Sequence, residues 1–160
     1  MKKLPSSSSW LRSGLFGLTL MLLYGCTDEP DSLRRELQTN RELWDSHSIL
    51  DYSYEFKRSC FCQGEITAPV IIHVQNMSII AVSEVSKDES VDAARWVYYL
   101  TVEELFDEID AALDKDVYEI VVDYDSELGY PSSINIDFDK STIDEEVGFL
   151  VELIDFNETG

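Results

Sequence analysis

The chain has 160 residues, and its 32 acidic residues outnumber its 12 basic ones, which gives a net charge of −20 at pH 7. This charge argues against binding to nucleic acid or to an anionic lipid surface, because both require positive charge on the protein. A basic protein partner or divalent cations are compatible with it, and so is a solvated acidic surface.

The first 25 residues have the three zones of an export signal. The basic residues of this segment are accompanied by no acid, and the apolar stretch at 15–23 is too short to span a bilayer comfortably. The stretch runs into Leu-Tyr-Gly-Cys at 23–26, which is similar to a bacterial lipobox. In a lipobox the cysteine sulfur receives diacylglycerol, and the signal peptidase cuts after the small residue that precedes it.

The sequence therefore predicts a signal peptide at 1–25, a lipidated tether at 26–32 beginning at Cys26, and a single domain at 33–160. Two or three acyl chains on one cysteine hold a protein stably on a membrane. The alternative is an uncleaved anchor that contains an incidental cysteine.

Cleavage would leave 135 residues, which is enough for one domain with a hydrophobic core but hardly for two. Nine basic residues would then face 32 acidic ones, a net charge of −23. Thr27 follows the cysteine, in place of the aspartate that retains lipoproteins in the inner membrane of many enteric bacteria. We expect a location in the cell envelope, facing the periplasm or the exterior, and the outer membrane where two membranes are present.

The first elements of the domain are a helix and three strands. Leu33, Leu37 and Trp44 recur at helical spacing, which predicts a helix over about 33–46. In segment 52–57, tyrosine and phenylalanine alternate with polar residues, as in a strand with one buried face.

Two β-branched runs follow, at 70–74 and 79–82, and predict two further strands. Asn76 lies between them and tolerates the left-handed backbone that a tight hairpin needs. The charged segment 83–92 is expected to be a loop.

The second half is expected to contain a helix and three more strands. Thr101 and Glu104 have the spacing of a capping box, and the apolar residues from 102 to 113 fall on one helical face. Strands are predicted at 118–124, 133–138 and 147–156, with a Gly-Tyr-Pro turn between the first two. The predicted fold is α+β, an antiparallel sheet of about six strands with two packing helices in the order α-β-β-β-α-β-β-β.

Four stretches of the chain resemble a family of bacterial secreted and lipid-anchored proteins, the domain-of-unknown-function family 6174. They are Tyr-Ser-Tyr-Glu-Phe at 52–56 running into Cys-Phe-Cys at 60–62, the helix start at 101–106, Tyr124-Asp125 with the segment 128–134, and Ile136-Asp137 before the acidic run 144–146. They are distributed along residues 44–156. The resemblance implies one domain in the cell envelope, and it implies no activity.

Cys60 and Cys62 are the most informative candidate site. With Cys26 consumed by lipid, they form an even pair in a compartment where disulfides persist. Residues two apart in an extended strand have Cα atoms roughly 6.6–6.8 Å apart, at the limit for bridging, so a disulfide requires a bend at Phe61. Three interpretations remain: a structural disulfide, a redox-active pair, and thiolate metal ligands, for which His47 and His73 are the only histidines available.

Carboxylates around the Gly-Tyr-Pro turn form the second candidate site. Asp123 and Asp125 alternate along one predicted strand, as do Asp137 and Asp139, together with Asn135, along the next. If these strands pair as a hairpin, the carboxylates could crowd onto one face and bind Ca²⁺, which prefers oxygen ligands. The alternative is a solvated acidic face.

The sequence contains no Gly-x-Ser-x-Gly, no phosphate-binding glycine loop and no His-Glu-x-x-His. We therefore expect a membrane-anchored envelope lipoprotein with a non-enzymatic binding or structural module, for which a basic protein is a candidate partner. The alternative is a thiol-redox or metal-handling protein that acts through Cys60 and Cys62.

Overall fold

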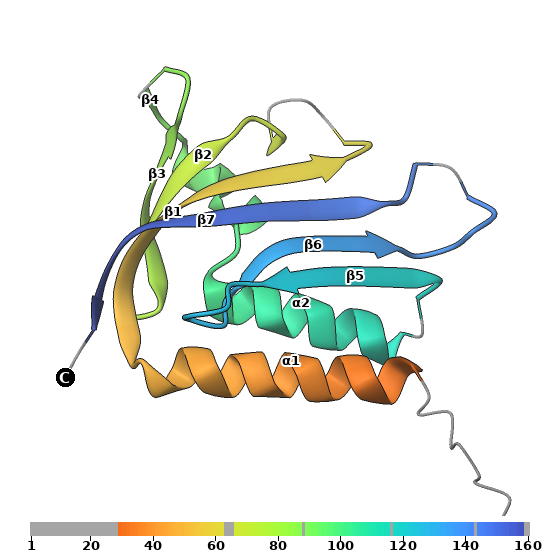
Figure 1. Cartoon of the computed structure of the whole chain (residues 1–160). Coiled ribbons are helices and arrows are strands. Elements are labelled where there is room, and N and C mark those ends of the chain that lie inside the picture. Colours follow the sequence, from red (N-terminus) through yellow and green to blue (C-terminus); the bar gives the residue numbers. More distant parts are fainter. Residues whose placement is uncertain (1–28, 63–65, 88, 116, 143, 159–160) are drawn as a thin grey trace, which may run out of the picture.

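Two α-helices pack on one face of an antiparallel sheet in the computed structural model, which describes residues 29–62, 66–87, 89–115, 117–142 and 144–158 (Figure 1). The helices are α1 (Glu29–Ser46) and α2 (Val102–Asp114), and a 3₁₀ helix, η2 (Ala93–Tyr98), precedes α2. The predicted α+β class with two packing helices is confirmed.

The sheet has seven strands in the order β4-β3-β2-β1-β7-β6-β5, all paired antiparallel. The strands are β1 (Ile49–Cys60), β2 (Val70–Gln75), β3 (Ser78–Glu84), β4 (Glu89–Ser90), β5 (Glu119–Tyr124), β6 (Pro131–Asp137) and β7 (Val147–Glu158). Strand β1 joins the two halves of the chain, because it pairs with β2 on one side and with β7 on the other.

The expected number of six strands was one too low. The additional strand β4 lies in segment 83–92, which was expected to be a loop, and it pairs with the end of β3. Two residues are too few for an alternating pattern, so periodicity could not predict β4. Helix η2 was not expected either, and the Asp92 side chain caps it by accepting a hydrogen bond from Ala94 N at 2.8 Å.

Helix α1 begins at Glu29, four residues before the predicted start, and so includes the last part of the expected tether. Two residues of this first turn are compatible with the extension. Pro30 is tolerated in the first turn because its missing N–H would have no helical partner, and Asp31 favours the positive end of the helix dipole.

The hydrophobic core lies between the helices and the face of the sheet that they cover, which we call the inner face. Tyr52, Tyr54 and Phe56 of β1 are buried there, as the alternation in the sequence predicted. On α2 the predicted apolar face is buried from Val102 to Ile109. The predicted capping box is present as well, with the Thr101 side chain accepting from Glu104 N and Glu104 accepting from Thr101 N.

One carboxylate connects three elements of the core. Glu103 accepts hydrogen bonds from the Tyr52 hydroxyl at 2.8 Å and from Trp44 Nε1 at 3.1 Å, and the Tyr52 hydroxyl accepts one from Val102 N at 3.0 Å. Burial, and next the negative charge of Glu103, raises the pKa of Tyr52. Because α1, β1 and α2 all contribute to this cluster, it fixes the helices against the sheet.

Both predicted turns have the left-handed backbone that their residues allow. Asn76 and Met77 have φ of 48° and 58°, which agrees with the tight hairpin expected between β2 and β3. Gly129 has φ of 81°, and a Cβ atom there would lie 2.5 Å from the backbone oxygen of Asn40. The turn before β6 therefore packs directly on α1 at a position where only glycine fits.

Candidate functional site

The outer face of the sheet, opposite the inner face, is covered by no helix in the described part of the chain (Figure 1). We define it by the outward residues of four strands, which include Ser59 on β1, Leu150 on β7, Asn135 on β6 and Val121 on β5. Apolar side chains are exposed on it: Leu150 is 53% exposed and Val121 is 49% exposed. This face is the part of the domain that packing leaves available for a partner.

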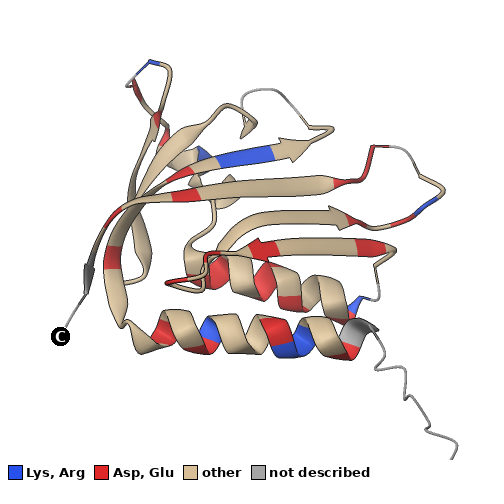
Figure 2. Ribbon diagram, in the orientation of Figure 1, with Lys and Arg blue, Asp and Glu red and all other residues tan. Residues whose placement is uncertain are grey.

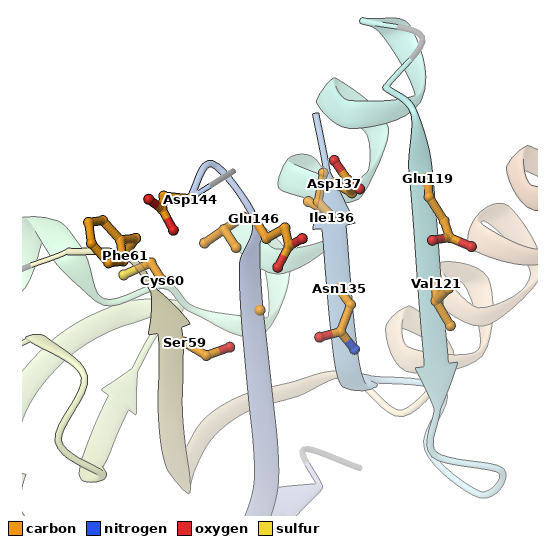
Figure 3. Close-up of a pocket in the computed structure, with 12 residues that line it drawn as sticks. Ser59, Cys60, Phe61, Glu119, Val121, Asn135, Ile136, Asp137, Asp144 and Glu146 are labelled. Carbon is orange, nitrogen blue, oxygen red and sulfur yellow. The ribbon is translucent and has the colours of Figure 1, made fainter. Parts of the chain in front are cut away.

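An open hollow of about 440 Å³ lies at the end of the outer face where β1 ends and β7 begins (Figure 3). Register places Ser59, Gly148, Asn135 and Val121 side by side across β1, β7, β6 and β5. This row lines the hollow together with neighbouring residues toward the same end of these strands and with Phe61, Asp144 and Glu146 beyond the strand ends.

Gly148 forms the floor of the hollow. A Cβ atom at this position would lie 2.4 Å from Ser59 Oγ and 2.9 Å from Asn135 Oδ1. The amide nitrogen of Asn135 points the other way and donates to Ser133 Oγ at 3.4 Å. Two neutral oxygen acceptors therefore converge above the glycine, and both are suited to hydrogen-bond donors of a ligand.

Four carboxylates surround this floor, from Glu119, Asp137, Asp144 and Glu146 (Figure 3). Among the described residues none of the four is in a salt bridge, and the ribbon coloured by charge shows acidic positions at this end of the sheet (Figure 2). Asp137 Oδ1 accepts a hydrogen bond from Asp139 N at 3.1 Å. The electrostatic character of the hollow is negative.

Cys60 lies at the mouth of the hollow, and the structure joins its sulfur atom to that of Cys62 as a disulfide. Their Cα atoms are 5.2 Å apart, within the range that disulfides span and closer than in an extended strand. Strand β1 ends at Cys60, and the chain bends at Phe61 and Cys62, which is the bend that a bond between them was predicted to need. Phe61, between the two cysteines, is 79% exposed.

The predicted calcium ligands do not come together. Asp123 pairs with Ser133, four positions along β6 from Asp137, so these two carboxylates are separated by roughly 14 Å along the strand. Asp125 accepts from Glu127 N and Leu128 N in the turn before β6. Among the described residues no group of three or more His, Cys, Asp or Glu could hold a metal ion.

Asp139, the fourth predicted calcium ligand, lies beyond the end of β6 and stabilises a turn. Its Oδ1 accepts from the Ser141 hydroxyl at 2.7 Å and from Ser141 N at 2.8 Å. These hydrogen bonds lower the pKa of Asp139. Calcium binding at this hairpin stays a prediction, which the melting temperature with and without added Ca²⁺ tests.

The histidines do not complete a metal or catalytic site with the cysteines. His73 lies on β2 and contacts Ser53 Oγ through Nδ1 at 2.7 Å, while Asp155 is in register with the other side of Ser53. This order places the serine between acid and histidine, whereas a Ser-His-Asp triad needs the histidine in the middle. His47 follows α1 and contacts the backbone oxygen of Glu127 at 3.3 Å.

Sequence reasoning missed most of the hollow. It singled out Cys60, Asn135 and Asp137, but not Ser59, Glu119 or Gly148, which register alone brings together with Asn135. One signal was available: a glycine inside an apolar strand pattern marks a close approach of other groups, and Gly148 is the one glycine in the run from Val147 to Phe156.

The candidate lipidation residue Cys26 lies outside the described residues. Within the described residues no helix has the length and apolar character needed to cross a bilayer.

Comparison with known proteins adds a family and no activity. The sequence profile of a family of unknown function, DUF6174, matches residues 36–156. No curated protein and no solved structure matches the chain.

Proposed function

The chain belongs to the domain-of-unknown-function family 6174, and from this premise we propose that it is a membrane-anchored bacterial envelope lipoprotein with a non-enzymatic binding module. The observation that carries the binding role is the uncovered outer face, where exposed apolar side chains adjoin a negatively charged hollow. A sheet face that served only to fold the chain would not need both features. A basic protein is the partner whose charge fits.

Anchoring at Cys26 would hold the hollow close to the membrane. Helix α1 begins at Glu29, three residues after Cys26, so its first turn would lie within about 11 Å of the lipidated residue. Strand β1 ends, and β5 and β7 begin, at the same end of the domain as the start of α1 (Figure 1). We therefore expect the partner to be another envelope protein at the membrane surface, on the outer membrane where two are present.

The anchor is tested by membrane fractionation and intact mass of the full chain and of its Cys26→Ser variant. We expect the wild-type protein in the membrane fraction, with a mass that corresponds to a lipidated chain starting at Cys26. The variant should lose the lipid and leave the membrane fraction on mild washing. A wild-type protein that retains residues 1–25 and carries no lipid would contradict the anchor.

The binding face is tested by photocrosslinking in living cells, with a photoreactive amino acid in place of Leu150 on the outer face. The matched position is Glu108, which is exposed on α2. We expect a defined crosslinked product from position 150 and none from position 108. Products from position 108 alone would show that the helices, and not the sheet, form the binding face.

A thiol-redox or metal-handling role through Cys60 and Cys62 is the second candidate, and the position of Cys60 at the mouth of the hollow favours it. A disulfide that closes so short a loop stabilises the fold by less than about 2 kcal/mol. The Cys60→Ser/Cys62→Ser variant should therefore stay folded. Loss of the outer-face crosslink in this folded variant would support the redox or metal role, and an unchanged crosslink would leave the pair a structural one.

A further inference from the structure

The outer face offers a surface that fits one chemical kind of occupant. We propose that it binds an extended arginine-containing segment of a partner protein, with one arginine side chain in the hollow between β1, β7, β6 and β5. The inference rests on the proposed function, because it names the group that the binding face recognises. The argument comes from the hydrogen-bonding groups, the charge and the aromatic ring that converge there.

The floor of the hollow accepts hydrogen bonds. Ser59 Oγ and Asn135 Oδ1 converge above Gly148, which leaves them room because it has no side chain. An arginine guanidinium is planar and carries five N–H donors, so it can donate to two oxygens that approach from opposite sides. A lysine ammonium lacks the planar fork that such a pair of acceptors favours.

The rim of the hollow supplies charge complementarity. Glu119, Asp137 and Glu146 lie closest to the floor along their strands, since each is two residues from a member of the row that contains Gly148. The positive charge of the guanidinium would be attracted by these acids. Arg58, the basic residue next to Ser59, is not available for this, because it stacks on the Phe149 ring at 5.3 Å.

The mouth of the hollow supplies an aromatic ring. Phe61 is exposed for 79% of its surface, and Figure 3 shows it beside Cys60 at the edge of the hollow. An exposed phenylalanine ring attracts a guanidinium that stacks on its face. The Cys60–Cys62 bond closes the backbone on both sides of this residue and so restrains the backbone that carries the ring.

The test is a fluorescence anisotropy titration of the full-length lipoprotein in detergent with a labelled peptide, Gly-Arg-Gly-Arg-Gly, at 0.15 M salt. Salt at this concentration screens the long-range attraction of a highly acidic protein for any cation. The hollow variant is Glu119→Gln/Glu146→Gln. Its matched control is Glu55→Gln/Glu152→Gln, which removes the same charge from a register pair on the same face away from the hollow.

We expect the hollow variant to weaken peptide binding at least tenfold and the control to weaken it less than threefold. Gly148→Ala, which fills the floor without a change of charge, should weaken binding at least fivefold. Phe61→Leu should weaken it two- to fivefold, which corresponds to the loss of one exposed cation–π contact. Circular dichroism confirms that each variant is folded.

Equal weakening in the hollow and control variants would overturn the proposal, since bulk charge alone would then explain binding. Equal affinity for the Gly-Lys-Gly-Lys-Gly peptide would overturn the assignment to arginine. If the arginine peptide does not bind at all, the proposal is overturned. A crosslink at position 150 together with no peptide binding would support the proposed binding module but with a different ligand. Failure of the arginine proposal can therefore be distinguished from failure of the proposed function.

Discussion

The two faces of the sheet differ in what their side chains do. On the inner face, aromatic residues such as Tyr54 and Phe56 are fully buried in the hydrophobic core. On the outer face, Leu150 and Val121 remain exposed, and the acids Glu119 and Glu146 surround a hollow. The same strands therefore have one face whose side chains stabilise the fold and one face where substitutions should change the free energy of unfolding little. Residues on the second face can be specific for a ligand without loss of stability.

Alanine substitutions at two neighbouring residues of β7 should show the largest difference in stability between the two faces. Phe149 is buried on the inner face with its ring 5.8 Å from that of Phe56, whereas Leu150 points outward. Phe149→Ala should lower the free energy of unfolding by about 3–5 kcal/mol, because it leaves a cavity in the core. Leu150→Ala should lower it by less than about 1 kcal/mol. Urea denaturation measures both, and similar losses would remove the distinction between the faces.

Alanine substitutions at two glycines compare a position needed for the fold with a position on the outer face. Gly129→Ala should cost about 2–3 kcal/mol of unfolding free energy, because φ is 81° and the added Cβ meets the backbone oxygen of Asn40. Gly148→Ala should cost about 1 kcal/mol or less, since Ser59 and Asn135 can turn their side chains away. Thermal unfolding of the two variants checks the order, and a larger loss at Gly148 would mean that the floor of the hollow is needed for folding.

The Tyr52 hydroxyl on the inner face should make the stability of the domain depend on pH. Its pKa is raised, mainly by burial, so above pH of about 10 the folded state keeps a proton that the unfolded state loses. Stability is then fully present below this pH and falls as the pH rises, by about 1.4 kcal/mol per pH unit for each such tyrosine. Tyr52→Phe should reduce that slope.

The same substitution removes the partner of Val102 N and one partner of Glu103, so it should cost about 1–3 kcal/mol at neutral pH. Tyr98→Phe is the control, because Tyr98 is exposed. Unfolding curves between pH 7 and 11 measure both effects. An unchanged alkaline slope in Tyr52→Phe would contradict the role given to this hydroxyl.

Much of the inner face could be predicted from sequence because it follows periodic rules. Alternation placed Tyr52, Tyr54 and Phe56 on one side of a strand, and capping-box spacing located the start of α2. The bend at Phe61 followed from the reach of a disulfide.

The hollow could not be predicted in the same way, because it depends on strand order. Ser59 and Asn135 are far apart in sequence and meet only because β7 returns between β1 and β6. The calcium hypothesis depended on strand register in the same way. Alternation along β5 and β6 correctly indicated which residues share a face, but it could not predict the register, which separates Asp123 from Asp137.

The central claim is that the outer face serves binding and not folding, and one variant tests it most directly. Glu119→Gln/Asp137→Asn/Asp144→Asn/Glu146→Gln neutralises the rim and keeps its shape. Asparagine preserves the acceptor at 137 and tolerates the φ of 89° found at Asp144.

The measurement is the free energy of unfolding of this variant in urea beside that of the wild type, with the arginine peptide titrated into both. We predict an equal or higher free energy of unfolding, because neighbouring like charges on a sheet are destabilising, together with loss of peptide binding. A fall of more than about 1 kcal/mol would show that the carboxylates hold the fold, and it would contradict the account.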